Sequence, residues 1–254
     1  MEPVYRLLEI TAKTAVLLTG TTIRYRGLEQ VPSGGGAVIA INHTSYVDFL
    51  PAGLATVRAG RRLRFMLKAE MQEVPIMNFL IKHAKAIPVD RSAGHGAYEA
   101  AVDSLRSGEI VGVYPEATIS RSFELKEFKS GAARMAHEAG VPIVPLIVWG
   151  AQRIWTKDHP KNLGHSKIPV NVAVGPPLDA SPDFERTTVE LHDAMEQVLT
   201  QAQRDYPEEP GAYWLPRRLG GSAPTLEEAA ALDAAELAER ARKRAQKKTG
   251  PNRT

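Results

Sequence analysis

The sequence predicts an α/β fold, a single domain with a largely parallel mixed sheet flanked by helices. Three observations lead to this prediction. Short apolar runs alternate with longer stretches of helical periodicity from residue 37 to residue 203. The runs have the length of buried strands, and glycines such as Gly108 and Gly140 stand where helices would end. The 254 residues are enough to bury a core.

The first predicted element is an amphipathic helix over residues 3–19, within an N-terminal segment of residues 1–24. Its charges lie mainly opposite an apolar face, and Gly20 is expected to end it. That face contains Val4, Leu7, Leu8, Thr11, Ala15 and Leu18, widened by Tyr5, Ile10 and Leu17. Such a helix either packs on the domain, which the pattern alone favours, or lies among lipid headgroups.

The main domain is predicted over residues 25–215. Ser45 and Asp48 have capping-box spacing, which predicts a helix from about Ser45. The other predicted helices span residues 73–83, 96–107, 127–139 and 184–203. Strands are predicted over 37–41, 63–67, 86–89, 110–114, 141–149 and 168–174.

Residues 216–254 are predicted to form a linker and a basic helical tail. Thr225 and Glu228 have the spacing of a second capping box. From residue 240 onward all seven charged side chains are basic: Arg240, Arg242, Lys243, Arg244, Lys247, Lys248 and Arg253. The simpler interpretation is a solvated, frayed end, and the alternative is a contact with anionic lipid. No aromatic residues interleave with these charges, so nucleic acid is not an expected partner.

Composition excludes several kinds of chemistry. The chain has no cysteine, which excludes disulfides, thiolate metal sites and acyl-cysteine intermediates. Charged residues interrupt the first twenty positions, so we expect no secretory signal there. No stretch of the sequence has the length and apolarity of a membrane-spanning helix, so we expect none. The net charge of +3 is mildly basic and favours anionic partners.

His43 and Asp48 form the first candidate catalytic pair. Five residues apart on a regular helix, they would point about 140° away from each other. They can meet if His43 lies in the loop after the strand that ends at Ile41 and Asp48 lies in the next turn. An aspartate on one ring nitrogen fixes the tautomer and makes the other nitrogen a general base. The pair alone is weak evidence, because the chain has seven histidines.

Three further motifs occur at or within predicted strands. Tyr114–Ser122 offers a carboxylate, hydroxyl groups and Arg121, a set able to hold an anionic head group. Ile87-Pro88-Val89-Asp90-Arg91 places an arginine after a strand, and Val141–Leu146 is an apolar strand with two prolines. Each also has a plain structural interpretation: a polar turn, a surface ion pair and a core or edge strand.

Together these four motifs resemble the glycerolipid acyltransferases of the lysophosphatidic-acid (1-acylglycerol-3-phosphate) acyltransferase type. That family carries an Asn-His-four residues-Asp block, an Ile/Phe-Pro/Ile-Val/Ile-Asp-Arg block, a Phe-Pro-Glu-Gly-Thr-Arg-Ser block and a Val-Pro-Ile-Val-Pro block. The chain has all four in order across residues 42–146, and Phe128-Lys129-Ser130-Gly131 is similar to a further family stretch. The resemblance fades beyond about residue 180. The third block departs from the family at Ala117, where glycine is usual, and at Ile119, where arginine is usual.

The resemblance implies a role for each matching residue. His43 would be the general base and Asp48 its orienting partner. On chemical grounds, we further expect backbone N–H groups near the helix start, around Thr44 to Tyr46, to meet the oxyanion. The implied substrate-binding residues are Arg91, Glu116, Thr118, Arg121 and Lys68, and Pro142 and Pro145 would form a wall of the acyl site. No metal or resident cofactor is implied, because acyl-CoA or an acyl-carrier-protein thioester enters already activated.

The expected function is transfer of a fatty-acyl group to the free hydroxyl of 1-acylglycerol-3-phosphate, which forms phosphatidic acid. Expected partners are the lysophospholipid acceptor, the thioester donor and a membrane surface, with acyl carrier protein as one possible carrier. A peripheral position on the cytoplasmic face of the membrane follows from the same expectation. Alternatives are the same chemistry on glycerol-3-phosphate, another lysophospholipid or a glycolipid, hydrolysis with water as acceptor, and a non-catalytic lipid-binding protein.

Overall fold

In a computed structural model of the protein, the structure describes residues 2–68, 73, 78, 82–89, 95–207 and 209–249. The chain divides into two compact units. Met1–Ile119 and Glu127–Pro207 form the sheet unit, and Ser120–Lys126 and Glu208–Thr254 form the C-terminal unit. The boundary predicted between residues 24 and 25 falls inside a strand of the sheet, so the N-terminal helix belongs to the sheet unit.

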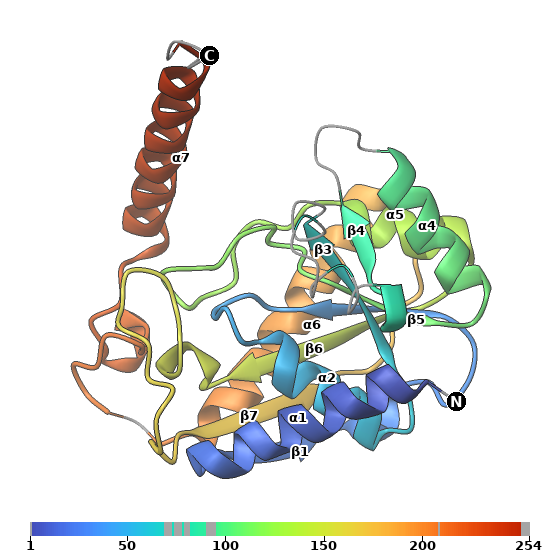
Figure 1. Ribbon diagram of the computed structural model, residues 1–254, viewed down its shortest axis with the longest axis horizontal. Helices are drawn as coiled ribbons and strands as arrows, with labels where there is room; N and C mark the ends of the chain where they lie inside the picture. The colour runs from blue at the N-terminus through green and yellow to red at the C-terminus, as the bar shows by residue number, and fades with distance from the viewer. Residues whose placement is uncertain are drawn as a thin grey trace. The chain divides into compact units, whose positions relative to one another are not determined.

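The sheet unit is built on one sheet, to which the described residues contribute seven strands in the order β1-β7-β6-β2-β5-β3-β4 (Figure 1). The five strands β2 to β6 are all parallel to one another. Strand β7 is antiparallel to β6, and β1 is parallel to β7. The strands are β1 (Thr22–Arg26), β2 (Ala37–Ile41), β3 (Leu63–Lys68), β4 (Ile87–Val89), β5 (Ile110–Val113), β6 (Ile143–Trp149) and β7 (Pro169–Val174). The predicted mixed, largely parallel sheet is confirmed.

Helices cover both faces of this sheet. One layer contains α4 (His95–Arg106), α5 (Gly131–Ala139) and α6 (Phe184–Arg204). On the other face α2 (Phe49–Arg58) packs against β3, β6 and β7, and α1 (Pro3–Thr19) packs beside α2. Short 3₁₀ helices lie at Leu28–Gln30 and Ala151–Arg153. The central strands β2, β5 and β6 are buried along their whole lengths, as their uninterrupted apolar sequences predict.

Three elements differ from the sequence prediction. Strand β1 was not predicted, although Ile23 and Tyr25 alternate with polar residues as an edge strand requires. Helix α2 begins at Phe49 and not near Ser45, because the preceding residues form a turn. Helix α5 begins four residues late, because the backbone N–H of Lys129 donates to the carbonyl oxygen of Pro115 (2.9 Å). The helix predicted over residues 73–83 falls mostly outside the described residues.

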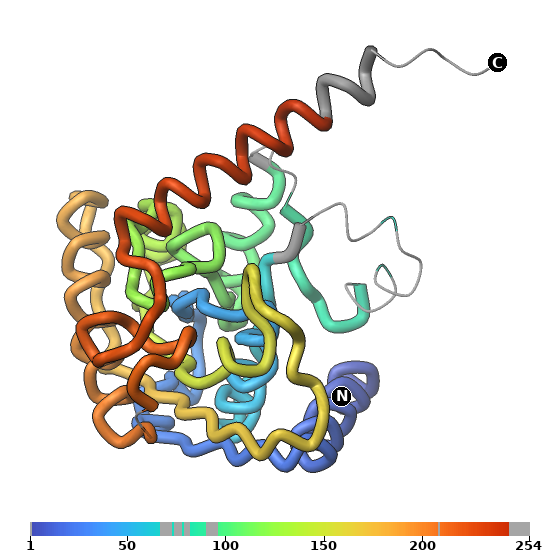
Figure 2. Tube along the Cα trace, turned by 90° about the vertical axis from the view of Figure 1, so that its left-hand side faces the viewer, coloured from blue at the N-terminus to red at the C-terminus, as the bar shows by residue number. Residues whose placement is uncertain are grey.

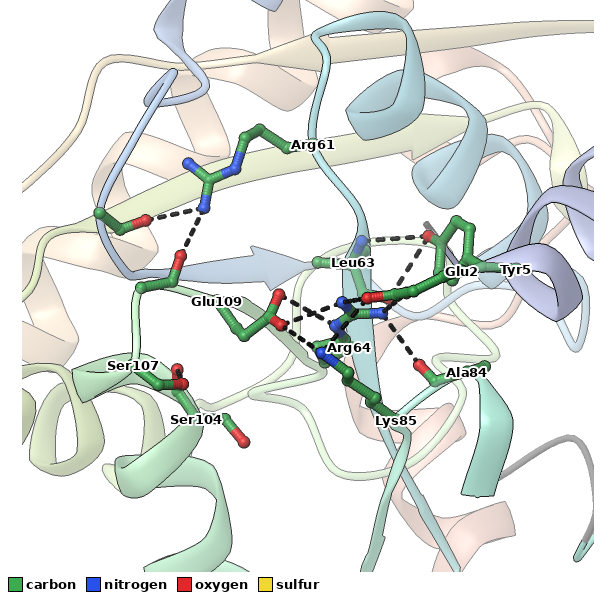
Figure 3. Close-up of polar contacts among 12 residues, drawn as sticks. Glu2, Tyr5, Arg61, Leu63, Arg64, Ala84, Lys85, Ser104, Ser107 and Glu109 are labelled. Atoms are coloured by element: carbon green, nitrogen blue, oxygen red, sulfur yellow. Dashed lines mark hydrogen bonds and ion pairs between the residues drawn. The ribbon is translucent and has the colours of Figure 1, made fainter.

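Helix α1 is fixed to β3 through its first turn (Figure 3). The hydroxyl of Tyr5 accepts the backbone N–H of Leu63 (3.1 Å) and donates to its carbonyl oxygen (3.4 Å). The guanidinium of Arg64, whose side chain is 3% exposed, donates to both carboxylate oxygens of Glu2 (2.6 and 2.7 Å). Arg64 also binds Glu109, and Lys85 bridges the same two acids. The network therefore satisfies a nearly buried guanidinium and ties the start of α1 to the sheet unit.

Replacing Glu2 with glutamine is expected to destabilise the protein by about 1–3 kcal/mol at neutral pH. The hydrogen bond from Arg64 is the main cause that lowers the pKa of Glu2, to about 2 from its ordinary value of 4.5. A carboxyl whose pKa is depressed by folding stabilises the protein above its unfolded pKa. That contribution is lost as the pH falls from about 4.5 towards 2.

Chemical denaturation of both proteins between pH 7 and pH 3 checks this expectation. The difference in unfolding free energy should shrink as the solution becomes more acidic. A difference that stays constant over this range would contradict the assignment of Glu2. Glu9→Gln is the matched control, because Glu9 pairs only with Lys13 one turn along α1 among the described residues.

The C-terminal unit contains a short 3₁₀ helix, Arg217–Leu219, and helix α7 (Leu226–Thr249). The predicted capping box is confirmed: Thr225 N–H donates to Glu228 (2.9 Å), and Glu228 N–H donates to the Thr225 hydroxyl (3.2 Å). Within this unit Arg121 pairs with Asp233 and Glu236 of α7, and Lys126 pairs with Asp233 (2.7 Å). Segment 120–126 is therefore bound to α7 by opposite charges.

Candidate active site

The carboxyl ends of β2 and β5 meet at one edge of the sheet, because these strands are adjacent and parallel. Asn42 and His43 follow β2, and Tyr114 and Glu116 follow β5. Ligands of open α/β sheets bind at this edge. The prediction that His43 lies in a strand-end loop is confirmed.

The turn from His43 to Asp48 folds around the carboxylate of Asp48. Its Oδ2 atom accepts the backbone N–H groups of Thr44 (2.9 Å) and Ser45 (2.7 Å) and lies 3.2 Å from Nδ1 of His43. Because these residues form a turn and not a continuous helix, two side chains five positions apart can meet. The structure thus brings together the two residues predicted to form the catalytic pair.

The Asp48 carboxylate is fully buried. Burial is the dominant influence and raises its pKa, although the hydrogen bonds from His43, Ser45 and Thr44 act in the opposite direction. Its Oδ1 atom has no hydrogen-bond partner among the described residues. Ionising this carboxyl inside the turn therefore costs folding free energy, as is common at functional sites.

Three contacts orient His43. Its backbone N–H donates to Oε1 of Glu116 (2.7 Å), and Nδ1 faces Asp48. The ring of Tyr114 stacks on the imidazole, with centroids 4.2 Å apart and planes 28° apart. The side chain of His43 remains 21% exposed. Because Nδ1 is directed at Asp48, Nε2 is the nitrogen able to accept a proton from a substrate.

The segment after β6 supports the catalytic turn through backbone groups. The carbonyl oxygen of Trp155 accepts the Ser45 hydroxyl (2.6 Å) and the Tyr46 N–H (3.0 Å). The hydroxyl of Thr156 donates to the carbonyl oxygen of Thr44 (2.7 Å). Sequence reasoning did not find Trp155 or Thr156, and for Trp155 no signal existed, because any residue presents a backbone carbonyl.

The predicted oxyanion donors are already engaged, so that prediction is wrong. The N–H groups of Thr44 and Ser45 donate to Asp48, and the N–H of Tyr46 donates to Trp155. Each of these groups stabilises the turn itself. An oxyanion would therefore have to meet donors outside residues 44–46.

The block after β5 contributes a buried carboxylate, an exposed threonine and a left-handed alanine. Glu116 is 4% exposed and holds the backbone of His43, so it positions the catalytic turn. Thr118 is exposed at the surface, and its N–H donates to the carbonyl oxygen of Glu116 (2.8 Å). Ala117 has a φ of 61°, the left-handed conformation that glycine adopts freely and that costs other residues about 1–2 kcal/mol. The buried Ile119 brings no charge to the site.

Arg121, predicted to hold an anionic head group, is bound by carboxylates within its own unit. It belongs to the C-terminal unit, where its guanidinium is 8% exposed and is bound by Asp233 and Glu236. Two carboxylates already neutralise this cation, which gives it a structural role that the sequence did not suggest.

The remaining predicted residues lie elsewhere or are not described. Pro142 precedes β6 at the opposite edge of the sheet from His43, and Pro145 is buried inside that strand opposite Ala40. The structure therefore does not bring these two prolines to the catalytic turn. Arg91 lies outside the described residues, and Lys68 ends β3 with a side chain that is not described.

The described residues contain no group of three or more His, Cys, Asp or Glu side chains that could hold a metal ion. The chemistry available at this edge is that of an imidazole with a buried carboxylate at Nδ1 and a second ring nitrogen that is not directed at that carboxylate.

Comparison with known proteins places this site in a family. Residues 22–149 match the model of the Acyltransferase family, a region that contains the turn and both strands that carry it. The chain is 31% identical over 123 residues to the 1-acyl-sn-glycerol-3-phosphate acyltransferase of Bacillus subtilis, covering 48% of this chain and 60% of that protein. It is 25% identical over 195 residues to the protein of the same name from Pseudomonas aeruginosa, covering 74% and 72%.

The fold also matches a solved structure, that of the 1-acyl-sn-glycerophosphate (LPA) acyltransferase PlsC from Thermotoga maritima. The TM-score is 0.68 over 80% of this chain and 81% of that one, at 21% sequence identity. The matched region spans less than two thirds of the Bacillus relative. With its His43–Asp48 turn at the end of β2 inside the matched region, this chain belongs to the Acyltransferase family.

Proposed function

We propose that the protein transfers a fatty-acyl group from an acyl thioester to the free hydroxyl of 1-acylglycerol-3-phosphate, forming phosphatidic acid for phospholipid synthesis. The observation that carries this proposal is the contact between His43 Nδ1 and the buried Asp48 carboxylate, in a turn that Glu116 and Trp155 hold in place. The names of the relatives supply the acceptor.

In the proposed reaction, Nε2 of His43 removes the proton of the acceptor hydroxyl while its oxygen attacks the thioester carbonyl carbon. The C–S bond then breaks, an ester forms, and the imidazolium returns its proton to the departing thiolate. Asp48 keeps the proton of His43 on Nδ1 and offsets the positive charge of the imidazolium. The donor is acyl-CoA or an acyl-carrier-protein thioester, and no further cofactor takes part.

The acceptor is the less constrained half of the proposal. Arg91 and Lys68 remain the proposed phosphate ligands, and Ile119 supplies no charge where the family pattern has arginine. Glycerol-3-phosphate, another lysophospholipid or a glycolipid are therefore the alternative acceptors. A hydrolase would use water, and a non-catalytic lipid-binding protein would not need a buried Asp48 carboxyl facing His43.

An acceptor panel tests the proposal. Purified protein is offered palmitoyl-CoA or palmitoyl-acyl-carrier-protein with 1-acylglycerol-3-phosphate, glycerol-3-phosphate or lysophosphatidylcholine, and products are identified by mass spectrometry. We expect kcat/KM to be highest for 1-acylglycerol-3-phosphate. A higher value for another acceptor would reassign the substrate, and release of free fatty acid alone would indicate a hydrolase.

A membrane surface is the proposed site of action, on the cytoplasmic face and without a spanning segment. None of the helices in the described ranges is long and apolar enough to cross a membrane. Helix α1 turns Tyr5 inward, while large apolar side chains point outward: Leu7 (61% exposed), Ile10 (53%), Leu17 (77%) and Leu18 (69%). A helix with an apolar outer face, bordered by Arg6 and Lys13, suits the plane of the lipid headgroups.

Replacing Leu17 and Leu18 together with serine is expected to weaken binding to phospholipid vesicles about 10-fold or more, because each leucine gives up apolar area that enters the interface. Vesicle flotation measures the bound fraction. Val189→Ser in α6, whose side chain is 59% exposed in the layer on the opposite face of the sheet from α1, serves as a control of similar chemistry. Equal binding of the α1 variant and the unmodified protein would argue against this surface.

A further inference from the structure

A loop over residues 157–167 follows the segment that supports the catalytic turn and contacts the end of α1 before the chain enters β7; we call it the linking loop. It begins directly after Trp155 and Thr156, which bind the catalytic turn. At its other end, Nδ1 of His165 lies 3.0 Å from the carbonyl oxygen of Leu18, and the Lys167 N–H donates to that of Thr19 (3.0 Å). Figures 1 and 2 agree in placing the loop, drawn in yellow, beside the end of α1.

The linking loop is rich in cations and carries one exposed leucine. Lys161, Leu163 and Lys167 are exposed, Leu163 by 54% of its surface. Asp158 is the single acidic residue of residues 157–167, against Lys157, Lys161 and Lys167 and two histidines. Cations around a protruding apolar side chain suit an anionic phospholipid surface, where charge and apolar insertion add.

The loop continues the apolar surface of α1 towards the active site. His165 contacts the backbone of Leu18, at the helix end that exposes Leu17 and Leu18. Leu163 precedes His165 by two residues in the chain. On the other side, Lys161 lies over the ring of Trp155 (4.1 Å to the centroid). That ring in turn lies 4.9 Å from the ring of Tyr46 in the catalytic turn.

The catalytic turn also exposes apolar surface of its own. The side chains of Tyr46 and Phe49 are 43% and 48% exposed. The ring of Tyr46 neighbours that of Trp155, and Phe49 is the first residue of α2, which packs beside α1. An acyl chain that reaches His43 from a bilayer would meet apolar side chains at that point.

We infer that the linking loop is a second membrane contact, in which Lys161 and Lys167 bind lipid phosphates and Leu163 enters the interface. This inference rests on the membrane site of action proposed above and assigns part of that contact to new residues. With α1 and the loop both seated, the catalytic turn faces the bilayer that holds the acceptor. An acidic carrier protein would also bind these cations, but it would gain little affinity from the exposed Leu17, Leu18 and Leu163.

Flotation with vesicles of phosphatidylcholine containing 0 or 30% phosphatidylglycerol tests the inference, with no substrate present. Lys161→Glu combined with Lys167→Glu should reduce binding to the anionic vesicles at least 30-fold, since about 1 kcal/mol is lost for each lysine before any repulsion. Lys161→Gln combined with Lys167→Gln should also reduce binding to the anionic vesicles, because the attraction of the two lysines is lost, but no repulsion from introduced carboxylates is added. Leu163→Asp should weaken binding to both kinds of vesicle.

Matched controls lie on α6, in the layer on the opposite face of the sheet from α1. Arg204→Glu reverses an exposed charge there, and Val189→Asp replaces an apolar side chain that is 59% exposed. Both controls should bind vesicles within about twofold of the unmodified protein.

Unchanged vesicle binding by the loop variants would overturn the inference. So would unchanged vesicle binding together with weakened binding to acyl carrier protein, which would assign the loop to that partner. Because no substrate is used, either result leaves the acyl-transfer proposal to be decided by its own product analysis. Absence of transferase activity, with loop-dependent vesicle binding intact, would refute the proposed chemistry and retain the surface.

Discussion

His43→Ala is expected to lower kcat about 10²–10⁴-fold with little change in stability, because the variant has no group to remove the acceptor proton. The His43 backbone N–H that binds Glu116 is retained in alanine, so the turn keeps this anchor. The lost stacking on Tyr114 is worth about 0.5–1.5 kcal/mol. Steady-state rates, together with circular dichroism and a denaturation midpoint, check the expectation.

The control for this variant is His137→Ala. His137 is an exposed histidine of α5 whose ring nitrogen lies 3.4 Å from the carbonyl oxygen of Ala180, on the other face of the sheet from α1. Its replacement should leave the rate within about twofold, as for other surface positions. A folded His43→Ala protein with near-normal turnover would refute the proposed base.

Two substitutions of Asp48 should separate its chemical role from its structural one. In Asp48→Asn the side-chain carbonyl can still accept the N–H groups of Thr44 and Ser45, and the cost of burying a charge disappears. We therefore expect stability to be unchanged or higher, while kcat falls about 10²–10⁴-fold because His43 loses its anionic partner. In Asp48→Ala both buried N–H groups lose their acceptor. This variant should therefore lose about 2–5 kcal/mol of unfolding free energy as well as activity.

Thermal and chemical denaturation of the two Asp48 variants, beside their rates, makes this comparison. If asparagine destabilised the protein as much as alanine does, the charge itself would be needed for folding and the proposed division of roles would fail. If asparagine left kcat unchanged, Asp48 would serve only to hold the turn.

The sequence predicted the parts of this protein that depend on local pattern. Apolar runs predicted β2, β5 and β6, because strands buried on both faces leave an uninterrupted signal. The strand-end position of His43 followed from the run that ends at Ile41. Capping spacing placed the start of α7 correctly at Thr225 and Glu228, where both reciprocal bonds form.

The same spacing misplaced α2. Asp48 does reach back to the N–H of Ser45, but it also binds Thr44 and His43, and these contacts fold residues 43–48 into a turn before the helix begins. One carboxylate thus serves as turn anchor and catalytic partner, which residue spacing alone cannot distinguish. The predicted oxyanion donors failed for the same reason, since the carboxylate uses two of them.

Contacts between distant segments could not be predicted from the sequence. Trp155 supports the turn through its carbonyl oxygen, which its residue type does not reveal. The ion pairs of Arg121 with Asp233 and Glu236, over one hundred residues later, have no signal in the local sequence. Pro142 matches its sequence block, yet its position before β6 puts it at the far edge of the sheet from His43.

A single-turnover experiment tests the central claim most directly. Purified protein in excess is mixed with acyl-CoA and isotopically labelled 1-acylglycerol-3-phosphate, and lipids and intact protein are followed by mass spectrometry. Direct transfer assisted by His43 predicts labelled phosphatidic acid in proportion to the thioester consumed, with no acyl group on the protein. Free fatty acid as the main product, or an acylated protein that precedes phosphatidic acid, would contradict it.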